Sequence, residues 1–145
     1  MSQAYRKSEL YLYRYSADMY RIEILNEKLK GEEQHGDLRV QTMGNEYRSS
    51  EHGRGVEDWY MRCEILREKI RKLEGITSCI TAVYNELREK SRYQRKYEIM
   101  LGILEHVYIM GEKFAGYIKM MGVPERTGYR YRNELVMRVA EELRL

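Results

Sequence analysis

The strongest constraint on the fold is a long stripe of mostly apolar residues in the middle of the chain. Between Val56 and Leu87 these residues recur in unbroken steps of three and four, the spacing that places side chains on one face of an α-helix. The stripe comprises Val56, Trp59, Cys63, Leu66, Ile70, Leu73, Thr77, Ile80, Tyr84 and Leu87. A helix of this length needs another helix to cover its stripe, so the sequence predicts an all-α fold of laterally packed helices.

A shorter stripe precedes it, and a segment without any stripe separates the two. The first stripe runs in the same steps through Tyr5, Ser8, Leu12, Tyr15, Met19, Ile22, Asn26 and Leu29. Residues 31–55 carry five glycines and many charges, which predicts a mobile connecting loop. Residues 1–90 are therefore predicted to form a helical hairpin or coiled-coil region. Its helices either fold back on each other or pair with those of a second copy in a homodimer, and the sequence leaves both arrangements open.

The composition agrees with a protein made of helices. Hydrophobic residues make up 43% and charged residues 34% of the 145 positions, and Pro124 is the single proline. This balance is too apolar for a disordered chain, and the abundant Glu, Lys, Arg, Leu and Met favour helices. Cys63 and Cys79 fall on one predicted helix about 24 Å apart, too far for a disulfide, and are predicted to be buried as small hydrophobes.

The sequence contains neither a run of about 18 apolar residues nor the apolar core of a signal peptide near its beginning. We therefore expect a protein that stays out of membranes and works in the cytoplasm.

Glycines divide the last third of the chain into three shorter helices. A helix is predicted over residues 91–110, where Gly111 ends it, and a shorter helix over residues 113–121. Gly122 marks the next turn, and the single proline is expected in the first turn of the last helix. A short helix, a tight glycine turn and a second helix are the layout of a helix-turn-helix, so residues 91–145 are predicted to form such a domain.

The last predicted helix has two chemically distinct faces. The apolar face consists of Gly128, Tyr131, Leu135 and Val139. The residues expected to cover it are Tyr117, Ile118, Met121 and Val123. Compared with other helix-turn-helix motifs, the larger side chain at Ile118 is offset by the missing side chain at Gly128, so the volume between the two helices stays nearly the same. These two residues are therefore predicted to pack together. The opposite face, near the start of the helix, presents Arg126, Tyr129, Arg130 and Asn133.

These outward side chains are of types that recognise double-stranded DNA. Arginine binds guanine bidentately, asparagine does the same to adenine, and tyrosine stacks, touches a thymine methyl or bonds phosphate. Lys119 and Arg132 flank the face and are expected to contact phosphates, and Thr127 completes the candidate DNA-binding set. Residues 92–145 contain ten Lys or Arg against seven Asp or Glu, whereas residues 1–91 contain sixteen of each. The excess positive charge is thus confined to the part predicted to bind DNA, which is compatible with a polyanionic partner.

Residues 107–143 resemble the C-terminal helix-turn-helix of the ArpU-like and RinA-like phage transcriptional regulators, which are similar to region four of bacterial sigma factors. The matching features are Tyr108 and Gly111 at the end of the long helix, the eleven-residue step to Gly122, and the run from Arg126 to Glu134. The preceding heptad helices around a polar loop also fit that family. The resemblance implies a phage or prophage protein in a bacterial host cell that activates late genes at promoter DNA, with RNA polymerase as a further partner.

The chain departs from the family at both helix starts of this motif. Lys113 and Pro124 occupy the places where the family usually has a capping Ser or Thr, and each missing cap costs roughly 1 kcal/mol. The helix over residues 113–121 is therefore predicted to be the least stable.

Other classes of function are less well matched. The sequence has no nucleotide-binding glycine loop, no metal-ligand spacing and no nucleophile with a base, and His35, His52 and His106 are isolated from one another. We therefore expect no enzyme, catalytic residue, metal, cofactor or small-molecule substrate. Two alternatives remain: an assembly protein like the small terminase subunit of phage DNA packaging, which usually places its DNA-binding motif first, or a helical protein-interaction module. A solution ring of eight or more copies would favour the assembly protein, whereas a monomer or dimer would favour the regulator.

Overall fold

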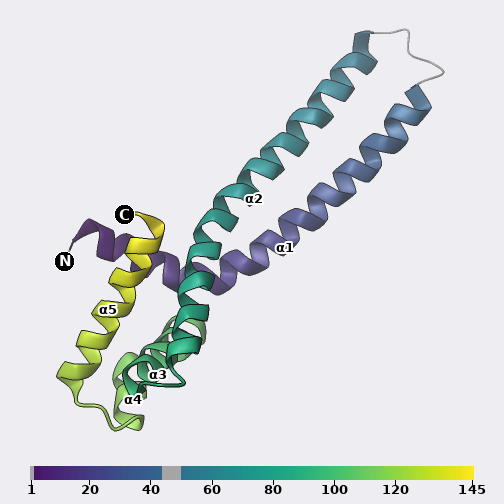
Figure 1. Ribbon diagram of the computed structural model, residues 1–145. Helices are drawn as coiled ribbons and strands as arrows, with labels where there is room; N and C mark the ends of the chain where they lie inside the picture. Colours follow the sequence, from purple (N-terminus) through teal and green to yellow (C-terminus); the bar gives the residue numbers. More distant parts are fainter. Residues whose placement is uncertain (1, 44–49) are drawn as a thin grey trace. The chain divides into compact units, whose positions relative to one another are not determined.

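The computed structural model describes residues 2–43 and 50–145, and all regular structure within these ranges is helical (Figure 1). The elements are α1 (Gln3–Met43), α2 (Ser50–Lys90), α3 (Arg95–Gly102), the π-helical segment η1 (Ile103–Ile109), α4 (Phe114–Met120) and α5 (Glu125–Leu143). The predicted all-α fold, with a helical hairpin and further helices at the C-terminal end, is confirmed.

The helices form two compact units that divide α1 and α2 between them. Residues 1–18 and 75–145 make up the first, here called the terminal unit, and Met19–Glu74 make up the second, the hairpin unit. This division differs from the predicted boundary at residue 90. Tyr5 and Leu12 of α1 and Leu87 of α2 belong to the same buried cluster as α3, η1, α4 and α5. Heptad spacing identifies an inward face but not the partner that covers it, so it could not reveal this division.

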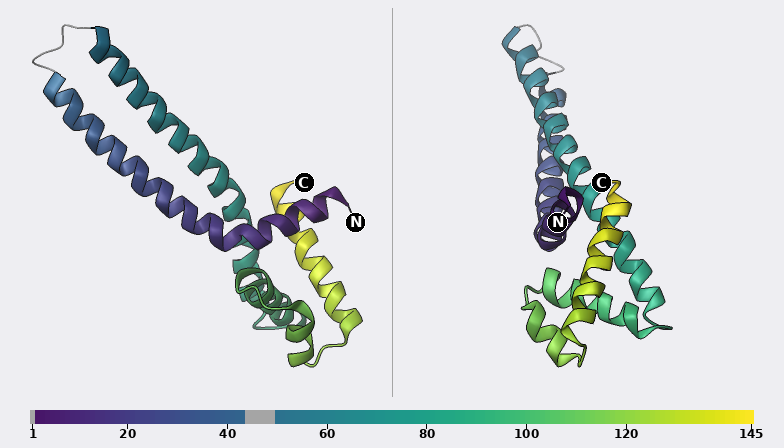
Figure 2. Two further views of the ribbon diagram at one scale, coloured as in Figure 1. Left: turned by 180° about the vertical axis from the view of Figure 1, so that it is seen from behind. Right: turned by 90° about the vertical axis from the view of Figure 1, so that its left-hand side faces the viewer.

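In the hairpin unit, the second part of α1 and the first part of α2 run side by side in opposite directions (Figures 1 and 2). Its fully buried hydrophobic side chains are Leu25, Cys63 and Ile70. The predicted stripe of α2 is confirmed along its whole length, since none of its ten members is exposed. Both cysteines are free; Cys63 is buried, as predicted, and Cys79 is half-buried.

The inward face of α1 agrees with the prediction at six of its eight positions and differs at the other two. Ser8 and Leu12 are buried, but Met19 and Asn26 are exposed, and the residues that precede them, Asp18 and Leu25, are buried instead. The inward positions therefore change phase at residue 18, where the helix leaves one unit and enters the other. A single uninterrupted heptad could not anticipate this change of packing partner.

The predicted loop over residues 31–55 is also wrong, because α1 continues to Met43 and α2 begins at Ser50; residues 44–49 lie outside the described ranges. Each glycine lowers helix propensity by about 1 kcal/mol, but tertiary packing can outweigh that cost. A Cβ atom at Gly36 would overlap the indole ring of Trp59, and the indole N–H of Trp59 donates to the carbonyl oxygen of Glu32 at 2.6 Å. Gly36 thus allows α1 and α2 to approach closely instead of ending the helix.

In the terminal unit, the predicted breaks at the C-terminal end are confirmed. Gly111 and Gly122 have φ values of 77° and 69°, in the left-handed region that glycine adopts without strain. The helix predicted to start at residue 91 begins instead at Arg95, and Pro124 lies immediately before α5 instead of in its first turn.

Tyr117 fixes α4 against the helix before it. A Cβ atom at Gly102 would overlap the phenol oxygen of Tyr117, so the tyrosine packs directly over the point where α3 passes into η1. Its ring also stacks on His106, with the centroids 4.9 Å apart and the planes inclined by 18°. The buried side chain of Tyr117 therefore holds the short helix α4 against α3 and η1.

Candidate nucleic-acid interface

The candidate interface rests on the packing of α4 against α5. A Cβ atom at Gly128 would lie 2.9 Å from Cγ2 of Ile118, and both residues are buried. The prediction that Ile118 packs over Gly128 is confirmed. The same contact brings the first turns of α5 close to α4 and thereby determines which of their side chains point outward.

The two helices of this pair start without side-chain caps. Lys113 precedes α4 and Pro124 precedes α5, and neither makes a side-chain capping hydrogen bond. At the other end of α4, the guanidinium of Arg95 donates to the carbonyl oxygen of Met121 at 3.0 Å. The orientation of α4 therefore depends on α3 and η1.

The two faces of α5 agree with the prediction, with one difference. Arg126, Tyr129, Arg130 and Asn133 are exposed, whereas Gly128, Leu135 and Val139 are buried. Tyr131 is only half-buried, and Val136 is fully buried in its place. The buried face is thus rotated slightly toward the side of Val136, and the outward face occupies the first half of α5.

Five of the seven predicted DNA-binding residues lie around one shallow hollow on this surface. Its lining consists of Arg126, Thr127, Tyr129, Arg130 and Asn133, with Glu134 and Met137. Lys119 lies in a neighbouring hollow that also includes Tyr129, so the two hollows share a wall. Arg132, the seventh residue, lines neither hollow.

The charges on this face are not neutralised internally. Among the described residues, Lys119, Arg126 and Arg130 form no ion pair. Glu134, which lines the same hollow as both arginines, is paired with Lys96 at 2.6 Å, and Glu125 at the start of α5 forms no ion pair among the described residues. The surface therefore offers cationic groups to an external anion.

Among the described residues of the hairpin unit, Arg62, Arg67 and Arg71 have carboxylate partners, whereas Arg21 forms no ion pair. Arg67 contacts Glu33 at 2.9 Å and Glu64 at 2.7 Å.

Arg132 is placed differently from the predicted phosphate contact. It is half-buried, with its guanidinium 4.6 Å from the ring centroid of Phe114 and 5.0 Å from that of Tyr129. The two rings lie 5.0 Å apart. Cation–π attraction of this kind contributes about 0.5–1 kcal/mol at exposed sites. Arg132 therefore supports the outward position of Tyr129.

The sequence analysis missed the contacts of two residues of α1, Tyr5 and Glu9. The Tyr5 hydroxyl donates to Oδ1 of Asn133 at 3.0 Å, and the Tyr108 hydroxyl donates to a carboxylate oxygen of Glu9 at 2.9 Å. Tyr5 was predicted only as an inward-facing residue of the first stripe. No local pattern could connect it with Asn133, because 128 positions separate them.

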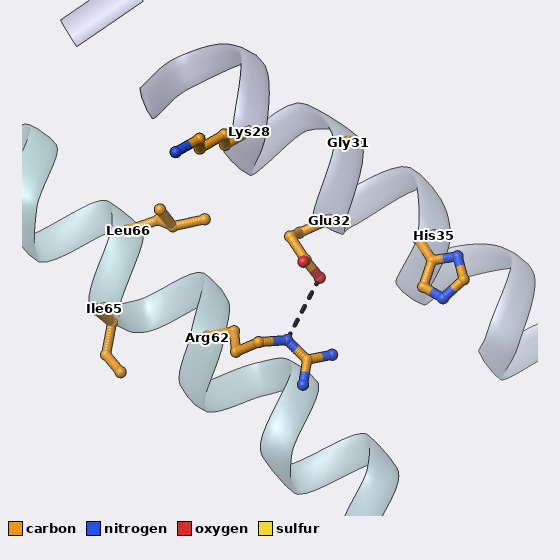
Figure 3. Close-up of a pocket in the computed structure, with 7 residues that line it drawn as sticks. All are labelled: Lys28, Gly31, Glu32, His35, Arg62, Ile65 and Leu66. Atoms are coloured by element: carbon orange, nitrogen blue, oxygen red, sulfur yellow. Dashed lines mark ion pairs between the residues drawn. The ribbon is translucent and has the colours of Figure 1, made fainter. Parts of the chain in front are cut away.

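A separate hollow in the hairpin unit does not combine reactive groups. Figure 3 shows Arg62 and Glu32 facing each other across it in an ion pair of 3.6 Å. His35 was predicted to lie in a loop, but it lies on α1. The opposite charges of Arg62 and Glu32 compensate each other within the hollow.

His106 is not isolated, because its Nδ1 lies 3.1 Å from Glu112 and its ring stacks on Tyr117. The side chain of His52 lies outside the described residues. Within the described ranges, no three His, Cys, Asp or Glu side chains are grouped as they would be around a metal ion, and no helix has the length and apolar character to cross a membrane.

Comparison of the chain with models of protein families, with characterised proteins and with solved structures gave no significant match. The chemistry of the α4–α5 surface therefore carries the functional argument.

Proposed function

We propose that α4 and α5 form a helix-turn-helix and that the protein is a sequence-specific DNA-binding transcriptional regulator. The observation that carries the proposal is the outward face of α5, where Arg126, Tyr129, Arg130 and Asn133 are exposed opposite a buried apolar face. Helices of this kind enter the major groove with their first turns and read base edges there.

Each side chain of the face has a chemical role in this proposal. Arg126 and Arg130 are free of internal ion pairs within the described ranges, so their guanidiniums can bond O6 and N7 of guanine. Asn133 bonds an adenine or another base edge in the next turn. Lys119, on α4, contacts the phosphate backbone and adds affinity without sequence information.

The proposed role in activating transcription is inferred from the resemblance to the ArpU-like and RinA-like phage regulators. We propose that the protein acts on late-gene promoters of a phage or prophage, together with the RNA polymerase of the host. The hairpin unit supplies a surface for the polymerase or for a second copy of the chain.

Selection from a pool of random duplexes tests the proposal directly. The full chain should enrich one short motif, and Arg130→Ala should lose preference at one base pair by about 1–3 kcal/mol. Arg71→Ala is the matched control, because Arg71 is an exposed arginine of the hairpin unit whose carboxylate partner is Glu68 on the same helix. It should enrich the wild-type motif. If the wild type enriches no motif, the DNA-reading proposal is wrong.

A further inference from the structure

We infer that Tyr5, at the opposite end of the chain, positions Asn133 and thereby contributes to base selection by α5. The hydroxyl of Tyr5 holds the oxygen of the Asn133 side-chain amide, so that the NH₂ group is the part offered to DNA. This inference rests on the proposed function, since it concerns which base the same surface selects.

Tyr5 is itself a fixed residue. Its side chain is only 6% exposed and belongs to the buried cluster of the terminal unit. Its backbone N–H donates to the hydroxyl of Ser2 at 3.1 Å, which satisfies a donor in the first turn of α1. A tyrosine held in this way has little freedom to move its hydroxyl away from Asn133.

A second contact, one turn further along α1, holds the same segment. Glu9 accepts the hydroxyl of the buried Tyr108 at 2.9 Å, and the ring of Tyr13 meets that of Tyr108 edge-on at 4.7 Å. The first turns of α1 are therefore anchored to η1 independently of Asn133. The position of Tyr5 does not depend on the single hydrogen bond that it makes to α5.

The electrostatic surroundings keep the Tyr5 hydroxyl protonated. Burial raises the pKa of Tyr5, the charge of Glu9 raises it further, and the nearby guanidinium of Arg132 only partly opposes them. The phenol is thus a hydrogen-bond donor throughout the neutral pH range. In the structure this hydroxyl donates to Oδ1 of Asn133, the acceptor atom of the side-chain amide, at 3.0 Å.

Fixing the amide in this way changes what the asparagine can read. A free asparagine can turn its amide over and present either an acceptor or a donor first. With Oδ1 held by Tyr5, the outward group of Asn133 is a donor, which matches N7 of a purine, O6 of guanine or O4 of thymine. Cytosine offers only a donor in the major groove and should be disfavoured as the base that Asn133 contacts.

The test uses the full chain and compares Tyr5→Phe with Asn133→Ala and with the double variant in the random-duplex selection. Asn133→Ala identifies the base pair that Asn133 reads. Tyr5→Phe should weaken preference at that same base pair about three- to tenfold and admit cytosine there, without changing the other positions. In the Asn133→Ala background, Tyr5→Phe should have no further effect.

Tyr13→Phe is the matched control, because it removes an exposed hydroxyl from the same helix while keeping the ring that contacts Tyr108. It should leave the selected motif unchanged. An unchanged motif for Tyr5→Phe, or an effect confined to base pairs that Asn133→Ala does not touch, would overturn the inference.

A measurement without DNA separates this inference from the proposed function. The NMR order parameter of the Asn133 side-chain NH₂ should be high in the wild type and lower in Tyr5→Phe. If the order parameter is the same in both, Tyr5 does not position Asn133, whatever the selection shows. If it falls but the wild type enriches no motif, the contact exists but the DNA-reading proposal fails, and base selection by Tyr5 fails with it.

Discussion

Side-chain volume at position 128 sets how closely α4 and α5 approach. Gly128 leaves room for Ile118, whose Cγ2 lies 2.9 Å from where a Cβ atom would be. The two residues could be predicted as a pair from the sequence because the sizes compensate each other across a contact expected between the two helices. A residue whose partner is remote in the chain, such as Tyr5, gave no comparable signal.

Exchanging the sizes of this pair should show that the two positions are coupled. Gly128→Val forces a branched side chain into Ile118 and should destabilise the fold by more than about 1 kcal/mol, and Ile118→Ala alone should also destabilise it through a cavity. The double variant should be more stable than the sum of the two effects predicts, by about 0.5–3 kcal/mol. Urea unfolding of the four chains measures this coupling, and strictly additive effects would contradict the contact.

A carboxylate of α2 should make the stability of the terminal unit depend on pH. Burial alone would raise the pKa of Glu86, but hydrogen bonds and charges from Lys90 and Arg138, at 3.2 and 2.9 Å, lower it overall. Because the folded pKa lies below the unfolded value, the contribution of Glu86 is complete above the ordinary value of 4.5 and is lost as the pH falls through the folded pKa.

Glu86→Gln should therefore reduce the free energy of unfolding more at pH 6 than at pH 3, by at most about 1 kcal/mol because the group is partly exposed. Glu89→Gln is the control, since Glu89 is 65% exposed in its side chain and pairs with Arg92 only at 3.8 Å. A loss for Glu86→Gln that is equal at both pH values would contradict the ion-pair account.

Among the helices, α2 was the easiest to predict and α1 the hardest, for physical reasons. The stripe of α2 keeps one phase through both units, whereas the inward face of α1 shifts to Asp18 and Leu25. Asp18 is 3% exposed and accepts a hydrogen bond from Arg14 at 3.5 Å, so a polar residue occupies a position that a hydrophobic pattern cannot identify. Glycines were informative at Gly111 and Gly122 and misleading at Gly36, because packing against a large ring also requires glycine.

The short helix α4 should gain stability from a cap. Lys113 has the extended backbone of an N-cap residue, with φ −70° and ψ 131°, but makes no side-chain capping bond. Lys113→Ser should stabilise α4 by about 1 kcal/mol, because a hydroxyl at this position can accept from a free backbone N–H. Hydrogen exchange of the α4 amides should slow accordingly, whereas Lys113→Ala should not slow it. Equal exchange in both variants would show that the missing cap does not limit α4.

For the chain as a whole, the surface that we propose binds DNA belongs to a unit made of residues 1–18 and 75–145. The buried cluster of the terminal unit includes Tyr5, Leu12, Ile80, Val83 and Leu87 in addition to residues after position 95. A polypeptide of residues 91–145 would lack these five side chains and expose the surfaces that they cover. We expect it to unfold without a cooperative transition.

A chain in which a flexible linker replaces residues 19–74 should, by contrast, keep the terminal unit and its cooperative unfolding. Thermal unfolding followed by circular dichroism distinguishes the two polypeptides. If residues 91–145 alone unfold cooperatively, the predicted domain boundary at residue 90 is supported instead.

The most direct test of the DNA-reading proposal is to map the surface that DNA touches on the full chain. Backbone amide NMR shifts should be recorded as the duplex enriched by selection is added, with a scrambled duplex as control. The account predicts that the enriched duplex perturbs Arg126–Asn133 and the surroundings of Lys119, and leaves the hairpin unit unchanged. Perturbations confined to Met19–Glu74, or identical for the two duplexes, would contradict the claim that α5 reads sequence.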